Sequence, residues 1–257
     1  MLRTAQPAFG KKAPNQELRM SIASVVLLVL ALLVVAVLAF VGVQVARTRR
    51  IAAEAERAVP PMGRFVEVDG NRIHYVEKGE GRPILFIHGL GAQLHQFRSP
   101  LFPLLDGFRL IAFDRPGSGY SVRAKGASAR LSEQARVVRG LIDRLGLEKP
   151  LVVGHSLGGA VALALAVDHP DAISGLVLLS PHTRETHSVP PAFAPLYISS
   201  PLKRWLIAQT VAVPASQKLA AQTLAYVFGP QQPPADYMTE GGGWLGLRPS
   251  HVYGSAT

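Results

Sequence analysis

A serine between glycines is the residue in this chain whose setting most clearly indicates chemistry. Residues 154–158 read Gly-His-Ser-Leu-Gly, between an apolar run at 151–153 and an Ala-rich stretch at 157–167. In a G-x-S-x-G sequence between a strand and a helix, the serine hydroxyl stands exposed on a sharp turn. The helix that follows points amide N–H groups and a positive dipole end at that turn, which suits a developing oxyanion. We therefore take Ser156 as a candidate nucleophile, with an ordinary turn serine as the alternative interpretation.

Two further loops follow apolar runs at the expected end of the same sheet. The first contains His88-Gly89-Leu90-Gly91 and the second runs from Asp114 to Ser121. Acyl-transfer sites need two backbone N–H donors for the oxyanion, one of them directly after the nucleophile. Leu90 N–H and Leu157 N–H are the candidate donors.

The neighbouring polar residues have structural interpretations. We expect His88 to order its loop, Asp114 to brace its glycine-rich loop by local hydrogen bonds, and His155 to pack beside the turn without acting as the base.

The elements that must position these loops alternate along the chain. Asp69-Gly70 predicts a tight hairpin turn, and the remaining runs read as strand and helix in turn. Such an order requires right-handed crossovers, so the predicted fold class is α/β, with a mostly parallel sheet and helices on both faces. The expected strands are 65–68, 72–77, 83–88, 109–113, 151–153 and 173–179, and the expected helices are 131–145, 157–167, 202–211 and 217–228.

These three loops together resemble those of the α/β-hydrolase family. The similarity covers residues 64–181 and rests on HG-x-G at 88–91, D-R-P-G-x-G-x-S at 114–121 and G-H-S-x-G-G at 154–159. The resemblance implies that Ser156 is the nucleophile, that Leu90 and Leu157 are the oxyanion donors, and that residues 182–257 form a lid. It disfavours the relatives with an aspartate at the turn, the haloalkane dehalogenases and epoxide hydrolases, and leaves perhydrolase-like and C–C bond hydrolases open.

The chain departs from that family pattern after Ser156. The family order places an acid and then a histidine downstream of the serine, each after a late strand. None of the downstream acids or histidines follows such a strand, so we expect the chain to be truncated before its triad acid and histidine. Glu185 and His182 could form an unusual pair of catalytic acid and base. His251 is expected at the surface. The acids downstream of Ser156 are Asp168, Asp171, Glu185, Asp236 and Glu240, and the histidines are His169, His182, His187 and His251.

An apolar segment near the N-terminus indicates a membrane anchor. Residues 21–43 contain no charged residue, and 23 residues at about 1.5 Å each suffice to cross a hydrocarbon core of about 30 Å. A cleaved signal peptide is the alternative, but its apolar core would be shorter. The N-terminal and C-terminal flanks carry the same total number of Lys and Arg residues, so the charge bias does not decide on which side of the membrane the catalytic domain lies. The predicted organisation is a tail at 1–20, a transmembrane helix at 21–43, a linker at 44–63, a core at 64–181 and a lid at 182–257.

Composition excludes several classes of function. Half of the net charge of +10 lies in residues 1–60 and no basic run occurs in the remainder, so we expect no nucleic-acid partner. There is no cysteine and no ligand spacing for a metal, so no metal or organic cofactor is expected. The expected partners are the lipid bilayer, through residues 21–43, and a small-molecule substrate that the anchor suggests is lipophilic.

Three functional hypotheses follow. The first is a membrane-anchored serine hydrolase acting on an ester or related acyl bond through Ser156. The second is a catalytically inactive membrane-tethered module that keeps the fold and binds a ligand or partner. The third is a chain that folds poorly by itself, because an open sheet edge and apolar helix faces would stay uncovered.

Overall fold

The computed structural model describes residues 21–184 and 198–255, and the chain divides into two compact units between Gly42 and Val43. Helix α1 (Ile22–Ala58) begins in the first unit, where its large apolar side chains are exposed. Within the described residues, α1 is the one helix long and apolar enough to cross a membrane. The predicted span at 21–43 lies at its N-terminal end.

The predicted linker at 44–63 is helical as far as Ala58. Helix α1 continues to Ala58 and stops before Pro60, which has no N–H to donate to a helix. Thr48, Ile51 and Ala55 are buried at spacings of three and four residues, so one stripe of the helix faces the protein. This segment is therefore part of the second folded unit.

Six strands form one sheet in the order β1-β2-β4-β3-β5-β6. The strands β3, β4, β5 and β6 are parallel to their neighbours among these four, whereas β2 is antiparallel to both β1 and β4. The predicted fold class is confirmed. The strands are β1 (Arg64–Val68), β2 (Asn71–Lys78), β3 (Arg82–Ile87), β4 (Phe108–Phe113), β5 (Leu151–His155) and β6 (Gly175–Leu179).

The hairpin turn between β1 and β2 is the one that the dipeptide predicts. Asp69 and Gly70 both have positive φ, 50° and 75°, and Val68 pairs with Asn71. Two consecutive residues with positive φ match the twist of a two-residue hairpin, and Asp-Gly tolerates them well. Asn71 then secures the turn by donating from its side chain to the Val68 carbonyl at 3.0 Å.

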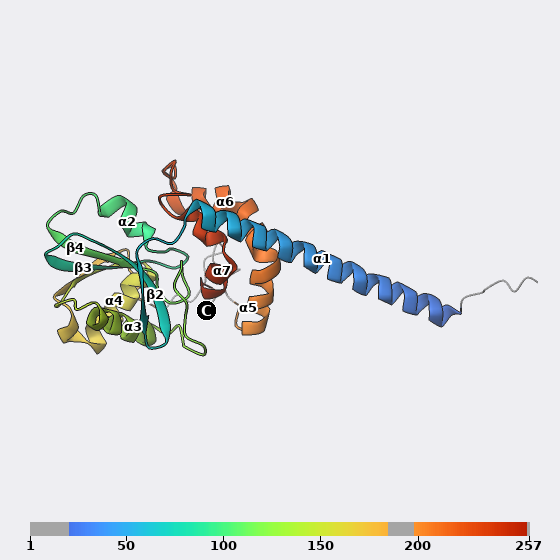
Figure 1. Cartoon of the computed structure of the whole chain (residues 1–257), viewed down its shortest axis with the longest axis horizontal. Coiled ribbons are helices and arrows are strands. Elements are labelled where there is room, and N and C mark those ends of the chain that lie inside the picture. The colour runs from blue at the N-terminus through green and yellow to red at the C-terminus, as the bar shows by residue number, and fades with distance from the viewer. Residues whose placement is uncertain (1–20, 185–197, 256–257) are drawn as a thin grey trace, which may run out of the picture. The chain divides into compact units, whose positions relative to one another are not determined.

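Alternating side chains of the central strands fill a core on each face of the sheet. On β3, Leu85 and Ile87 point into the cluster beneath α3 (Leu131–Arg144) and α4 (Leu157–Asp168), and Ile84 and Phe86 point into the cluster beneath α2 (His95–Leu101). Figure 1 shows α3 and α4 on one side of the sheet and α2 on the other. Helices on both faces explain why these strands read as continuous apolar runs.

Beyond β6 the described chain is helical and contains no further strand. The helix expected at 202–211 is interrupted, because an α-helix gives way to a π-helical turn at Ala208. The helix expected at 217–228 starts earlier, at Val213, with Pro214 in the first turn, where its missing N–H costs nothing. The elements are η1 (Pro170–Ala172), α5 (Pro201–Ile207), η3 (Ala208–Ala212), α6 (Val213–Phe228), η4 (Gly243–Leu247) and α7 (Pro249–Ser255).

Truncation of Leu141 tests the packing of α3 on the sheet. Leu141 is fully buried in the core cluster under α3, so we expect Leu141→Ala to lower the free energy of unfolding by about 2–5 kcal/mol. Leu131→Ala on the same helix is the control, because that side chain is 39% exposed. Denaturant titration in detergent measures both, and equal losses would contradict the assigned packing.

Candidate active site

The turn at Ser156 has a backbone conformation that few residues adopt. Ser156 lies between β5 and α4 with φ 54° and ψ −119°, and positive φ costs energy for any residue with a Cβ atom. Its amide donates to the Leu179 carbonyl at 3.0 Å, while its carbonyl accepts from His182 N–H at 3.1 Å. Hydrogen bonds to β6 and to the segment that follows it therefore hold the turn in place.

Three glycines make room for this turn. A Cβ atom on Gly158 would overlap the carbonyl oxygens of Ile87 and His88, and one on Gly154 would lie 2.6 Å from the Gly158 carbonyl oxygen. A Cβ on Gly89 would lie 3.2 Å from the Ser156 Cβ. Close backbone approach thus explains the spacing of glycines that the sequence shows.

A cavity of about 900 Å³ lies at the carboxyl end of the parallel strands. Leu90 and Leu157, the two predicted oxyanion donors, both line it, together with His182 and Asp168. The loop after β3 and the first turn of α4 therefore meet at one cavity. In open α/β sheets, ligands bind at this end of the strands.

His88 and Arg115 fix the loop that carries Leu90. Burial lowers the pKa of His88 to about 3, and the nearby Arg115 guanidinium acts in the same direction. His88 Nε2 accepts from the Arg115 amide at 2.9 Å, and Nδ1 lies 2.8 Å from the Gly89 carbonyl oxygen. The Arg115 side chain donates to the His88 and Gly89 carbonyls at 3.0 Å each. His88 thus orders its loop, as the sequence predicts.

Asp114 braces three segments at once. Its carboxylate accepts from Leu94 N–H and from Tyr120 N–H, each at 2.8 Å, and its Oδ2 lies 2.8 Å from His74 Nδ1. Burial raises the pKa of Asp114, but the His74 contact and the amide donors outweigh it, so its pKa lies below the usual value. The local brace that the sequence predicts is present, and it extends to β2.

Sequence reasoning did not single out His74 or Gln96. His74 is buried on β2, 40 residues before Asp114, and its other ring nitrogen contacts the Met62 carbonyl. The Gln96 side chain lies 2.7 Å from His155 Nδ1 and accepts from Gly89 N–H at 3.1 Å. This contact supports the prediction that His155 is a neighbour of the turn, and no local pattern marks either residue.

His251 is buried, so the expectation of a surface position is wrong. Its side chain is 4% exposed, and Nε2 lies 3.1 Å from the Gly91 carbonyl oxygen. Nδ1 has no hydrogen-bond partner among the described residues. Helix α7 packs against the loops at Gly91 and Gly117, and a Cβ on Gly254 would overlap the Gly117 carbonyl. This long-range packing buries the histidine.

The structure assigns no partner to the Ser156 hydroxyl. Among residues 21–184 and 198–255, no hydrogen bond joins that hydroxyl to a histidine, and no cluster there could hold a metal ion. Glu185 and His187 lie outside the described residues. The expectation that the triad acid and histidine follow residue 257 stays a prediction.

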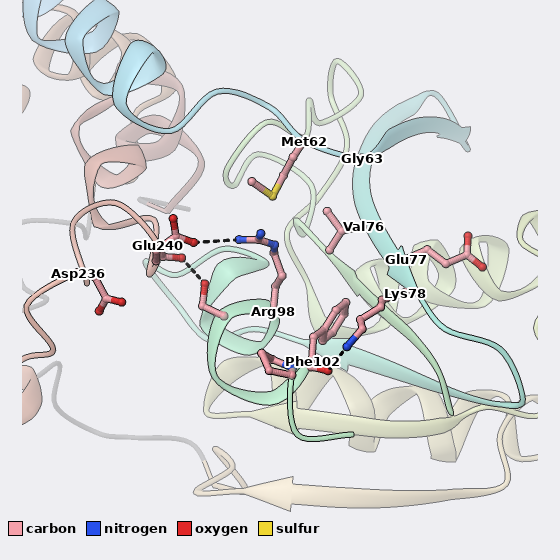
Figure 2. A pocket seen from close by; sticks show the side chains of 11 residues that line it. Met62, Gly63, Val76, Glu77, Lys78, Arg98, Phe102, Asp236 and Glu240 are labelled. Atoms are coloured by element: carbon pink, nitrogen blue, oxygen red, sulfur yellow. Dashed lines mark hydrogen bonds and ion pairs between the residues drawn. The ribbon is translucent and has the colours of Figure 1, made fainter. Parts of the chain in front are cut away.

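Two of the downstream acids lie at a different cavity. This cavity of about 560 Å³ is lined by Asp236 and Glu240. Figure 2 shows the Arg98 side chain pointing toward Glu240. The Arg98 guanidinium lies 3.5 Å from the Glu240 carboxylate, and both residues line this cavity. The Glu240 carboxylate therefore pairs with a residue of α2.

Substitution of Gly158 tests the close approach at the turn. We expect Gly158→Ala to lower the free energy of unfolding by about 3 kcal/mol, because the new methyl group meets two backbone carbonyls that cannot move aside. Gly175→Ala is the matched control, since its Cβ would lie 3.6 Å from the nearest atom, a Leu151 methyl carbon. Denaturant titration of the two variants measures the difference, and equal stability would refute the geometry.

Lowering the pH should reduce the free energy of unfolding, because His88 and His251 are buried in their neutral form. Burial lowers the pKa of His251 to about 4 and that of His88 to about 3, whereas an unfolded histidine titrates near about 6.5. Between these values the unfolded chain binds protons that the folded chain does not. The free energy of unfolding should therefore drop by about 1.4 kcal/mol per histidine for each pH unit lost from about 6.5 to 4.

Replacing His251 by Gln should remove the part of the slope that His251 contributes, while His88, and His95 and His155, whose pKa values burial also lowers, continue to titrate. Denaturant titrations between pH 7 and pH 4 provide the measurement. An unchanged slope in His251→Gln would show that His251 is not buried in its neutral form.

Comparison with known proteins identifies the family. A sequence model described as "alpha/beta hydrolase fold" matches residues 82–225, more than half of the chain. The match includes all three loops at the cavity.

Individual relatives are similar over parts of the chain. The dihydrolipoyllysine-residue acetyltransferase component of the acetoin cleaving system of Cupriavidus necator is 42% identical over 118 residues, which are 46% of this chain and 31% of that protein. Haloalkane dehalogenase 2 of Mycobacterium tuberculosis is 38% identical over 119 residues, 46% of this chain and 42% of that protein. The chain thus spans less than half the length of either relative.

A solved structure is similar over more of the chain. The crystal structure of a membrane phospholipase A, described as a novel bacterial virulence factor, has a TM-score of 0.58 and 25% identity, and the similarity covers 91% of this chain and 73% of that one. Strand order, the turn at Ser156 and the family match agree, and the chain belongs to the α/β-hydrolase fold family.

Proposed function

We propose that this protein is a membrane-anchored serine hydrolase that acts on an ester or related acyl bond. Ser156 Oγ attacks the acyl carbonyl carbon, a new C–O bond forms, and the alcohol leaves with a proton while the acyl group stays on the serine. Water then releases the acid. This sequence of steps needs an exposed nucleophile and donors for the negative charge on the carbonyl oxygen.

The observation that carries the proposal is the strained turn at Ser156. A serine held at φ 54° costs stability, and such strain persists where the surrounding structure enforces it. Hydrogen bonds from neighbouring segments enforce it here, and the glycines around it exclude side chains. The turn also brings the first amide of α4 beside the serine. Leu157 N–H and Leu90 N–H, from residues that line the cavity, are the proposed oxyanion donors.

A lipophilic ester is the substrate class that fits the anchor. The apolar part of α1 would hold the catalytic unit at a bilayer, where esters with long acyl chains concentrate. The similarity to a membrane phospholipase A supports the same class. The likeness to haloalkane dehalogenase supports it less, because the residue at the turn of this chain is a serine and not the aspartate that those enzymes use.

A catalytically inactive module that binds a ligand or partner is the second candidate. One observation favours it: within the described residues, no histidine side chain is hydrogen-bonded to the Ser156 hydroxyl. Removing a triad member typically costs several orders of magnitude in rate and leaves weak catalysis by the oxyanion donors.

Labelling with a fluorophosphonate distinguishes the two candidates. In the hydrolase the Ser156 oxygen attacks phosphorus and displaces fluoride, so a version extended through the predicted triad acid and histidine should gain one covalent label in detergent. Ser156→Ala should gain none. Ser132→Ala is the matched control and should label normally, because Ser132 is an exposed serine that lines the cavity beside Leu157.

Intact-protein mass spectrometry measures the label. Equal labelling of the unchanged chain and of Ser156→Ala would refute the role of Ser156. If the version without substitutions is not labelled and shows no ester turnover above buffer, the catalytically inactive binding module is favoured.

A further inference from the structure

The helices after β6 carry large apolar side chains that remain exposed. Seven of them lie on α5, η3 and α6, with Leu202 66% and Trp205 51% exposed. On α5, Leu202, Trp205 and Leu206 are three and four residues apart and so share one face. Exposed large apolar side chains grouped in this way can mark an interaction site. We call it the cap patch: Leu202, Trp205, Leu206, Val211, Leu219, Tyr226 and Val227.

The charge of residues 198–228 has one sign. Residues 198–228 contain no Asp or Glu, and Lys203 and Lys218 are exposed among the apolar residues. Arg47 and Arg49 are exposed on α1, in the segment that packs against the same helices. A surface that combines exposed apolar side chains with Lys and Arg suits the boundary of a bilayer containing anionic lipid.

Contacts within the second unit join the helices after β6 to the part of α1 that follows Val43. The Thr48 hydroxyl donates to the Thr210 carbonyl at 2.8 Å, and Ile51 packs with Val213. Thr48 follows Val43 by five residues, about 7.5 Å of helix rise. A headgroup layer is about 5–8 Å thick, so Thr210 would lie at headgroup depth if the apolar segment ends at Val43.

The cap patch continues directly from this contact. The Thr210 hydroxyl donates to the Leu206 carbonyl at 2.6 Å, so Leu206 and Trp205 are within about one helical turn of Thr210. Tryptophan concentrates at membrane interfaces, where its ring is apolar and its N–H reaches polar groups. An aqueous setting would leave these side chains in water beside an anchor that already spans the bilayer.

We propose that the cap patch is embedded in the headgroup–acyl boundary of the same bilayer that α1 crosses, with anionic headgroups against Lys203 and Lys218. This inference rests on the proposed anchor. Embedded in this way, α5 forms a second membrane contact. The segment after β6 then sits on the lipid surface, and a lipophilic substrate can reach the cavity near Ser156 from the bilayer.

Fluorescence of Trp205 tests the proposal, because the chain contains only two tryptophans, Trp205 and Trp244. The full-length Trp244→Phe variant is reconstituted in vesicles of phosphatidylcholine and phosphatidylglycerol with brominated acyl chains. We expect at least about twofold quenching of Trp205 relative to unbrominated vesicles, strongest with bromine near the carbonyl end of the chain. Quenching should weaken in vesicles of phosphatidylcholine alone.

Trp205→Phe is the matched control. Trp244 belongs to the same segment but packs against Ile51, Val213 and Leu247, so its emission should change little in brominated vesicles. Subtracting the emission of Trp205→Phe from that of the unchanged chain gives the Trp205 emission independently. The test therefore still works if Trp244→Phe does not fold.

Two outcomes would overturn the proposal. Trp205 emission that aqueous iodide quenches and bromolipid does not would place the cap patch in water. Shielding from both quenchers would show that protein, including a second copy of this chain, covers it.

Failure of the underlying function would look different. A chain that alkaline carbonate strips from the vesicles has no transmembrane anchor, and a chain that fluorophosphonate does not label lacks the proposed nucleophile. Neither result depends on the position of Trp205.

Discussion

The close approach of backbone segments around Ser156 is the constraint on which the rest of the site depends. The end of β3 comes so near to the start of α4 that a methyl group on Gly158 has no space, and Pro181 after β6 leaves none for a methyl group on Gly159. The sheet supplies this proximity, because β5 lies between β3 and β6 in the strand order. The serine keeps its unfavourable φ because Leu179 at the end of β6 and His182 after it hydrogen-bond to its backbone.

Much of this arrangement was predictable because it is local. Asp69-Gly70 specifies a turn by its own conformational preferences, and the glycines at 154, 158 and 159 mark a tight strand-to-helix connection. Apolar runs with helices between them imply a parallel sheet without any knowledge of contacts. The family resemblance rested on these same segments, and the fold confirms it.

What sequence reasoning missed depends on residues distant in the chain. His74 and Asp114 are 40 residues apart, and only the antiparallel pairing of β2 with β4 brings them together. His251 follows no recognisable pattern, and it is buried because α7 packs on loops that belong to the first half of the sheet. The π-helical turn at Ala208 likewise has no signature in composition. Its backbone departs from α-helical geometry next to Thr210, where the carbonyl accepts from Thr48 of α1.

Arg248 joins regions that are otherwise separate. Its side chain pairs with Glu56 of α1 at 2.8 Å, donates to the Gly119 carbonyl, and lies over the Tyr120 ring at 4.3 Å. The Tyr120 hydroxyl in turn donates to the Val59 carbonyl at 2.6 Å. The glycine-rich loop after β4 is thus tied to the exit of the long helix by two crossed links. Because Tyr120 N–H also donates to Asp114, a displacement of this end of the helix would be passed to the Asp114 carboxylate and from there to Leu94 at the start of α2.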